Sequence, residues 1–177
     1  TFIVVGDVDV AATEQKIQEI FGGIKNPAKL AAKGSVGDLG GKKGFQTAIF
    51  TDKELSSSDV SLIQIKPEEK KFDTIANRAQ KIPLNIAHAI INRRFSRLAK
   101  KEGSAITSGS ISSSVLFREA TIGSVDVTAK DGNWQAAVPV LEQELRRAVE
   151  HGFTESELNE ITAGMINNYE QNVETSA

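Results

Sequence analysis

Few residues of this chain could carry catalytic chemistry, and its two histidines are the most informative of them. A zinc site on a helix needs histidines at positions i and i+4 on one face, with a glutamate between them as the base. His88 is followed four residues later by Asn92, and an isoleucine stands where the base would be. His151 adjoins Gly152 at a predicted helix end, where an imidazolium interacts favourably with the helix dipole. The chain also has no cysteine, so its own residues assemble no zinc site.

Asp7 and Asp9 are the second candidates, because they follow an apolar stretch at residues 2–5 that predicts a buried strand. Ligands of α/β folds bind at the carboxyl ends of strands, so two carboxylates there could form an acidic ligand site. The same residues suit a helix start, where side-chain acceptors and negative charge stabilise the free amides. No third carboxylate is clearly placed with them, and we therefore interpret them as turn and capping residues. A small-ligand-binding α/β domain that uses Asp7 and Asp9 is the alternative hypothesis.

Two other patterns fail the tests for known sites. A phosphate-binding loop ending at Gly41-Lys42 would need glycine at position 36 and serine or threonine at position 43, which hold valine and lysine. The serines between Ser108 and Ser114 include no G-x-S-x-G motif and no obvious histidine–aspartate partnership, so they indicate the polar side of a strand or a loop. We therefore assign no catalytic, metal-binding, cofactor-binding or substrate-binding residue.

A basic cluster consists of Arg93, Arg94, Arg97, Lys100 and Lys101. Nucleic-acid surfaces combine basic side chains with stacking aromatics and an overall positive charge. The chain has 6% aromatic residues and a formal net charge of −2, so we exclude a nucleic-acid partner. We interpret the cluster as a solvated helix face, with a contact to an acidic neighbouring domain as the alternative.

The secondary-structure elements must position these residues. The predicted strands after the first helix come in adjacent pairs and do not alternate one by one with helices. Gly22-Gly23 should end the first helix, and residues 25–44 predict a long exposed connection. The order β-α-β-β-α-β-β-α-α predicts an α+β domain, with a mixed, largely antiparallel sheet and helices packed on one face. Two strands near the start, at residues 45–51 and 59–66, are the predicted antiparallel neighbours. The remaining elements are a strand at residues 2–5, two strands within 104–130, and helices at 11–21, 72–101, 134–151 and from 154 onwards.

Local signals set the helix boundaries and faces. Asp73 is the predicted N-cap of the main helical region, and Pro83 should divide or bend it. Thr154 and Glu157 form a capping box for the last helix. The buried face of the helix at 134–151 is predicted to consist of Val138, Leu141, Leu145 and Val149.

The length of 177 residues is that of one domain, and we expect residues 1–177 to form a single α/β domain. We find no initiator methionine, signal peptide or transit peptide, and no apolar run of the ~20 residues that span a membrane. The chain opens in a strand pattern and closes in a helix pattern, so we expect an excised piece of a longer protein with a truncated last helix. The lack of cysteine is compatible with the bacterial periplasm and equally with the cytosol.

Three motifs, spread over nearly the whole chain, resemble the insulinase/pitrilysin family of zinc metallopeptidases, the inverzincins. Their order and spacing match the second, non-zinc domain of a half in that family. The first motif is Ile3-Val4-Val5-Gly6-Asp7-Val8-Asp9 with Phe21-Gly22 after the helix; the second is Asn92-Arg93-Arg94-Phe95 through Leu98; the third is Gly152-Phe153-Thr154 with Glu155, Glu157 and Leu158.

The resemblance implies the fold of the mitochondrial-processing-peptidase-like metallohydrolase domain. Members have repeated α/β domains, usually two in each half, and the halves close into a chamber around peptide substrates. Their H-x-x-E-H motif lies in the first domain of the catalytic half. The resemblance thus implies no cofactor in this piece and zinc in the preceding domain of the full-length protein. The implied partners are neighbouring domains of the same chain and the peptide substrate of the full-length enzyme.

The non-zinc half of the family contributes an arginine and a tyrosine, seven residues apart, to substrate binding. The aligned positions here are Ala99 and Ile106, and neither side chain can donate a hydrogen bond. The only tyrosine is Tyr169, so a small shift of the alignment does not restore the pair. The piece therefore fits the second domain of the zinc half, or part of an inactive paralogue.

We expect a non-zinc-binding domain of a zinc metalloendopeptidase that forms chamber wall and supports the catalytic domain in peptide hydrolysis. The fragment alone is expected to be inactive. The alternative is a non-catalytic structural or assembly homologue of a processing peptidase. An intact H-x-x-E-H motif upstream of this piece would favour the first hypothesis, and a degenerate motif would favour the second.

Overall fold

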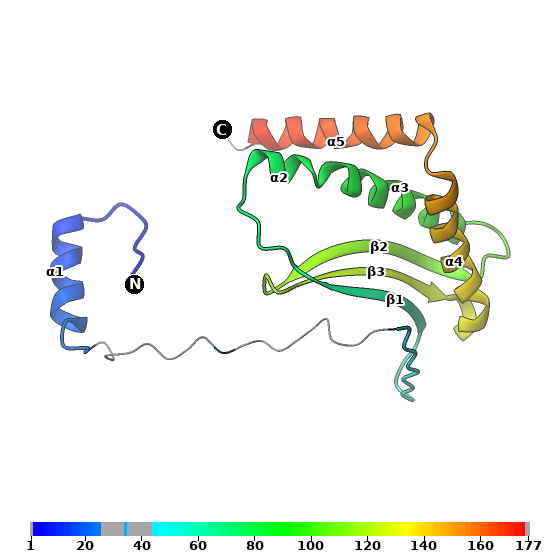
Figure 1. Ribbon diagram of the computed structural model, residues 1–177, viewed down its shortest axis with the longest axis horizontal. Helices are drawn as coiled ribbons and strands as arrows, with labels where there is room; N and C mark the ends of the chain where they lie inside the picture. Colours follow the sequence, from blue (N-terminus) through cyan, green and yellow to red (C-terminus); the bar gives the residue numbers. More distant parts are fainter. Residues whose placement is uncertain (1, 26–33, 35–43, 176–177) are drawn as a thin grey trace. The chain divides into compact units, whose positions relative to one another are not determined.

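The structure is a computed structural model that describes residues 2–25, 34 and 44–175. Contacts divide the chain into two compact units, Thr1–Val36 and Gly37–Ala177, and each is described by itself. Helix α1 (Val10–Phe21) belongs to the first unit, and the other described elements belong to the second (Figure 1). The glycines tested as a phosphate loop, and most of the connection predicted at 25–44, lie outside the described residues. The single domain over residues 1–177 stays a prediction.

Helix α1 begins and ends where the sequence predicts it. Asp9 is its N-cap, because the carboxylate accepts a hydrogen bond from the amide of Ala12 at 2.9 Å. At the other end, the amide of Gly22 donates to the carbonyl oxygen of Gln18 at 2.8 Å. A Cβ atom at Gly22 would stand 2.3 Å from that oxygen, so this close approach needs glycine.

Residues 2–5 do not form a strand, which corrects the prediction made for them. A strand is stable only when its backbone groups pair with a neighbouring strand, and the described part of the first unit contains no other strand. Phe2 instead packs on Phe21 of α1, with the ring centroids 4.5 Å apart. Phe2 therefore contributes to the first unit through an aromatic contact, while Ile3 and Val5 are exposed.

The second unit contains a three-stranded antiparallel sheet in the order β1-β3-β2. The strands are β1 (Ser58–Pro67), β2 (Ile106–Leu116) and β3 (Ala120–Ala129), which confirms three of the predicted strands. Residues 45–51 form no strand and do not pair with β1, so that prediction is wrong. Alternation shows that a segment can enter a sheet but does not identify its partner. The partner of β1 is β3, far along the chain.

The helices of the second unit follow the predicted boundaries closely. The main helical region is divided as predicted, and Pro83 lies in the first turn of its second helix, where an absent N–H costs little. Thr74, not Asp73, caps the first of the two helices, because Asp73 binds Arg78 instead. Within the described residues, no helix combines the length and apolar character that a bilayer requires. The helices are α2 (Ile75–Ala79), α3 (Ile82–Ala99), α4 (Trp134–His151) and α5 (Glu155–Thr175), with the 3₁₀ turn η1 (Lys130–Gly132) before α4.

Helices α3 and α4 pack on one face of the sheet, and α5 lies along α3 (Figure 1). Phe95 of α3 is fully buried and lies against β2 at Gly109, where a Cβ atom would come within 2.8 Å of the ring. An antiparallel sheet with helices on one face is the α+β architecture that the sequence predicts. The buried cluster between the layers consists of Ile91, Phe95, Ile106, Val125, Val127, Ala129, Ala137 and Leu141.

The buried face of α4 differs in part from the predicted one. Leu141 is buried and Leu145 is partly buried, as predicted. Val138 and Val149 are exposed, Val149 to 79%, which corrects the other half of the prediction. A charged residue, Glu144, is buried on this helix with 5% exposure. The buried face of α4 thus includes a charged residue, Glu144, beside Ala137 and Leu141, and apolar periodicity does not reveal it.

Candidate functional site

The face of the sheet opposite the helices carries hydroxyl and carboxylate groups. Asp126 of β3 accepts hydrogen bonds from Ser61 of β1 at 2.6 Å and from Ser124 at 2.8 Å. Asp59 of β1 accepts from Thr128 of β3 at 2.7 Å. Ser108, Ser110, Ser112 and Ser114 of β2 lie in the same strip, which confirms their interpretation as the polar side of a strand, while Ser113 alternates to the other face. An open depression of about 420 Å³ is lined by Asp59, Ser61, Ser108, Gly109, Ser110, Asp126, Val127 and Thr128.

The two histidines lie on different helices and are not brought together in a metal site. His88 is half-buried on α3, and this burial lowers the pKa of its imidazole. His151 is the exposed last residue of α4. Among the residues that the structure describes, no group of three or more histidines, aspartates, glutamates or cysteines could hold a metal ion. The described residues therefore do not fit the zinc of the inverzincin motif.

Asp7 and Asp9 both lie in the first unit. Asp9 caps the N-terminus of α1, because its carboxylate accepts a hydrogen bond from the amide of Ala12. Asp7 lies two residues before it in a bend and is exposed. Asp9 thus has the capping role that the sequence favours, and the alternative ligand role for the pair stays a hypothesis.

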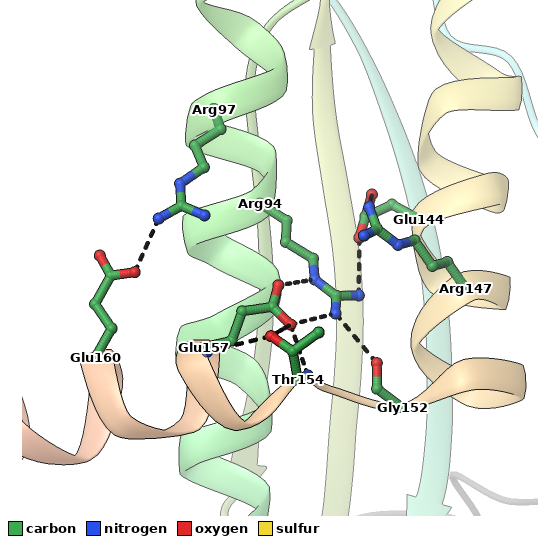
Figure 2. Close-up of polar contacts among 8 residues, drawn as sticks. All are labelled: Arg94, Arg97, Glu144, Arg147, Gly152, Thr154, Glu157 and Glu160. Atoms are coloured by element: carbon green, nitrogen blue, oxygen red, sulfur yellow. Dashed lines mark hydrogen bonds and ion pairs between the residues drawn. The ribbon is translucent and has the colours of Figure 1, made fainter.

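The most elaborate polar arrangement joins α3, α4 and α5 around Arg94 (Figure 2). The Arg94 guanidinium donates to both carboxylate oxygens of Glu157 on α5, at 2.6 and 2.8 Å. It also donates to Glu144 of α4 at 3.2 Å and to the carbonyl oxygen of Gly152 at 3.1 Å. Its Cζ atom stands 5.1 Å from the centroid of the Phe153 ring. One side chain of α3 thus contacts two other helices, α4 and α5, and the loop between them.

The helix ends around this network are built by their own sequence. Gly152 has φ of 67°, a left-handed conformation that glycine adopts readily, and it ends α4. The predicted capping box follows. The amide of Thr154 donates to Glu157 at 2.9 Å, and the amide of Glu157 donates to the Thr154 hydroxyl at 3.3 Å. The capping box confirms the predicted start of α5 and holds the Glu157 carboxylate in reach of the guanidinium.

The charges of the network stabilise one another. Hydrogen bonds from Arg94 lower the pKa of Glu157 to about 2, with further lowering from the amide and hydroxyl of Thr154 against the opposing effect of burial. The bond to Glu157 raises the pKa of Arg94 in turn. Arg147 approaches the second oxygen of Glu144 at 3.8 Å. The Glu157 carboxylate therefore remains ionised and paired at neutral pH.

The geometry suits a structural joint better than a catalytic group. Arg94 is 6% exposed, and every buried side-chain polar atom among the described residues has a hydrogen-bond partner. The prediction of a solvated basic face is therefore wrong for Arg94. It holds for Arg93 and Arg97, which are about half exposed and share Glu160 at 2.9 and 2.8 Å. The position of Arg94 beside the buried Phe95 is the only local signal of its burial.

Comparisons with known proteins identify the family of the chain. A family model described as the Peptidase M16 inactive domain matches residues 1–165. The chain belongs to this family. A comparison with curated proteins gives no match. The insulinase/pitrilysin resemblance of the sequence is thereby confirmed.

Solved structures of insulinase-type proteases share the fold of this M16 domain. The first half of the periplasmic protease PqqL from Escherichia coli is 20% identical, with a TM-score of 0.70 over 97% of this chain and 36% of that one. A structure of PqqL gives 21% identity and a TM-score of 0.70, over 97% and 19% of the two chains. A predicted insulinase family protease from Yersinia pestis gives 15% identity and a TM-score of 0.69, over 97% and 36%. The chain thus spans about a third or less of these proteins.

Ala99 and Ile106 are the positions that the sequence analysis aligns with the substrate-binding arginine and tyrosine of the family. In this M16 domain they lie at the end of α3 and the start of β2. Ala99 is the last residue of α3 and packs partly buried against the core. Ile106 is the first residue of β2 and has no exposed surface. Both side chains therefore contribute to packing.

Proposed function

We propose that this M16 domain is the second, non-zinc domain in the zinc-containing half of a metalloendopeptidase. There it forms part of the chamber wall and supports the catalytic domain. The observation that carries the proposal is the one-sided layer, with helices on one face of the sheet and, on the other, an open face whose Asp59–Asp126 end is polar. A water-filled chamber needs such walls, because polar side chains stay hydrated while the apolar core lies behind them.

The Arg94 network supports this role because a chamber wall must hold its shape. The network joins α3, which packs on β2, to α4, which packs on β3. It also joins both helices to the start of α5 through Glu157 and Gly152. Fully satisfied buried networks rigidify the elements that they join. The helical layer would thus fix the curvature of the sheet behind the open face.

The reaction itself would take place outside this domain. Peptide hydrolysis of this type uses a zinc-activated water with a glutamate as base. The donor set of the described residues does not fit that site, and the family description marks the domain as inactive. The zinc would be held by the preceding domain of the same protein. The domain would act by positioning that neighbour and by lining the space that the peptide enters.

A non-catalytic assembly homologue is the second candidate function. The observation that favours it is the aliphatic pair Ala99 and Ile106, which is packed into the core where the non-zinc half of active members binds substrate. In that case the one-sided layer would line a cavity with no reaction in it.

For either candidate we extend the proposal to the bacterial periplasm, because PqqL is described as periplasmic. Cell fractionation tests that part.

The test is peptide cleavage by the full-length protein that contains this domain. Purified protein is incubated with a mixed peptide library, with and without a zinc chelator, and the products are read by mass spectrometry. We expect cleavage that stops with the chelator and returns with added zinc, and no cleavage by the 177-residue chain alone. Full-length protein that holds no zinc and cleaves nothing would favour the assembly homologue. Cleavage by the 177-residue chain would overturn the proposal.

A further inference from the structure

The open face of the sheet has two ends of different chemistry. The polar end holds Asp59 and Asp126 with their hydroxyl partners, on adjacent strands. Along the same two strands the face becomes apolar. Ile63 is two residues beyond Ser61 in β1, and Ile122 is two residues before Ser124 in β3; residues two apart in a strand lie on one face. With Ile65 opposite Ile122, the strip therefore runs from acidic to aliphatic.

The side chains of both ends are accessible. Ile63 is 58% exposed and Ile65 is 48% exposed. Asp59 is exposed and Asp126 is half-buried, and both line the open depression. Asp126 and Ile122 are four residues apart in β3, which corresponds to ~13 Å at ~3.3 Å per residue. Four residues of an extended peptide span the same length, and side chains four residues apart point to the same side.

The charge of the polar end is uncompensated. Asp59 and Asp126 accept hydrogen bonds from hydroxyl groups, which orient the carboxylates but do not neutralise them. Among the described residues, no lysine or arginine forms an ion pair with either carboxylate. Every basic side chain of the Arg94 network belongs to the helical layer behind the sheet. The face therefore complements a cation beside an aliphatic surface.

We propose that the open face binds an extended peptide segment in which a basic residue stands four positions from an aliphatic residue. The basic side chain lies over Asp59 and Asp126, and the aliphatic side chain lies over Ile63, Ile65 and Ile122. This inference rests on the proposed function, because it assigns to the chamber wall a preference among peptide substrates. It names the substrate class, which neither the family nor the fold supplies.

The experiment measures binding of fluorescent peptides by the full-length protein. The reference probe is a capped peptide of serine, glycine and threonine that contains arginine and leucine four positions apart. One matched probe has glutamine in place of the arginine, and another has the arginine and leucine adjacent. Fluorescence anisotropy gives Kd where the probe stays intact, and initial rates give KM where it is cleaved. We expect the reference probe to bind roughly fivefold to tenfold more tightly than the glutamine probe, as two half-exposed charge contacts allow.

The variant that tests the face is Asp59→Asn with Asp126→Asn, which keeps an oxygen acceptor for each hydroxyl donor. We expect the preference for arginine over glutamine to fall to about twofold or less. The matched control, Glu170→Gln on α5, removes a carboxylate from the helical side and should leave the preference unchanged. Raising the salt from about 0.05 M to about 0.5 M should weaken the same preference in the unmodified protein, so the proposal is tested even if the double variant fails to fold.

The outcomes separate this inference from the proposed function. Peptides that are bound or cleaved with no preference for arginine, or with a preference that survives both the double variant and high salt, overturn the inference alone. Equal affinity for the two spacings of arginine and leucine overturns the part that concerns the aliphatic end. If the full-length protein neither binds nor cleaves any probe, the proposed function fails and the inference fails with it.

Discussion

Replacing Arg94 by methionine should destabilise the domain severely, because it leaves the half-buried Glu157 without its cation and the buried Glu144 with only the surface residue Arg147 at 3.8 Å. Arg94 and Glu144 are each 6% exposed at the side chain, and Glu157 is 15% exposed. Removing one partner of a buried ion pair costs ~3–5 kcal/mol. The pKa of Glu157 gives an independent figure: lowering it from 4.5 to about 2 corresponds to about 3 kcal/mol at neutral pH. We therefore expect a loss of ~3–5 kcal/mol for Arg94→Met at pH 7.

The pH dependence gives this prediction its sharper form. The folded pKa of Glu157 is depressed, so its stabilisation is present above the unfolded pKa of about 4.5 and disappears as the pH falls towards the folded value of about 2. The unmodified chain should lose about 3 kcal/mol between pH 5 and pH 2 from this group. Arg94→Met should show little of this loss, because its Glu157 lacks the guanidinium that lowers the pKa. The two stabilities should therefore converge in acid.

The assay is urea unfolding followed by far-UV circular dichroism at several pH values. The control is Arg97→Met, whose side chain is 53% exposed and binds Glu160 at the surface, and which should cost below ~1 kcal/mol. A loss below ~1 kcal/mol for Arg94→Met at pH 7, or an acid dependence equal to that of the unmodified chain, would refute the reasoning about the network.

Three further substitutions test the packing of the second unit. Gly109→Ala would place a Cβ atom within 2.8 Å of the Phe95 ring, and we expect denaturant unfolding to show a loss of ~1–3 kcal/mol. Leu141→Ala removes a buried core side chain, and the same measurement should show a loss of ~2–5 kcal/mol. Replacing Phe117-Arg118 by Asn-Gly should raise the melting temperature and add ~1 kcal/mol, because both residues have positive φ in the β2–β3 turn.

Each of these substitutions has a control or a refuting result. Gly123→Ala introduces a Cβ atom with nothing within 4 Å, so a loss as large as that of Gly109→Ala would contradict the steric argument. Val149→Ala changes an exposed position of α4 and should cost below ~0.5 kcal/mol. A larger loss for Val149→Ala than for Leu141→Ala would mean that the wrong face of α4 is assigned to the core. A lower melting temperature for the Asn-Gly chain would refute the turn argument.

The sequence predicts the parts of the fold that depend on neighbours in the chain. Asp9 and Gly22 bound α1, and the Thr154–Glu157 capping box starts α5, as their residue types indicate. Pro83 marks the boundary between α2 and α3 for a similarly local reason. Caps and proline act within one turn of helix, so no knowledge of the tertiary structure is needed to place them.

The parts that depend on distant partners are not predicted. Residues 45–51 are the predicted neighbour of the strand at 59–66, but β1 pairs with β3 instead. Arg94 and Glu144 are classed with the surface by residue type, although the docking of α4 on α3 buries both. Asp59 and Asp126 are 67 residues apart in the sequence. Only the register of β1 with β3 brings them onto one face of the sheet. Tertiary register thus decides what the sequence pattern leaves open.

The central claim is that this M16 domain belongs to a zinc enzyme without holding the zinc itself. The most direct test is the zinc content of the full-length protein, measured by mass spectrometry of the metal, before and after His88→Asn with His151→Asn. The account predicts about one zinc per chain in both proteins, because it assigns the zinc ligands to the preceding domain and the described residues here offer no group of three or more ligands. Loss of the zinc in the double variant, or absence of zinc from the unmodified full-length protein, would contradict it.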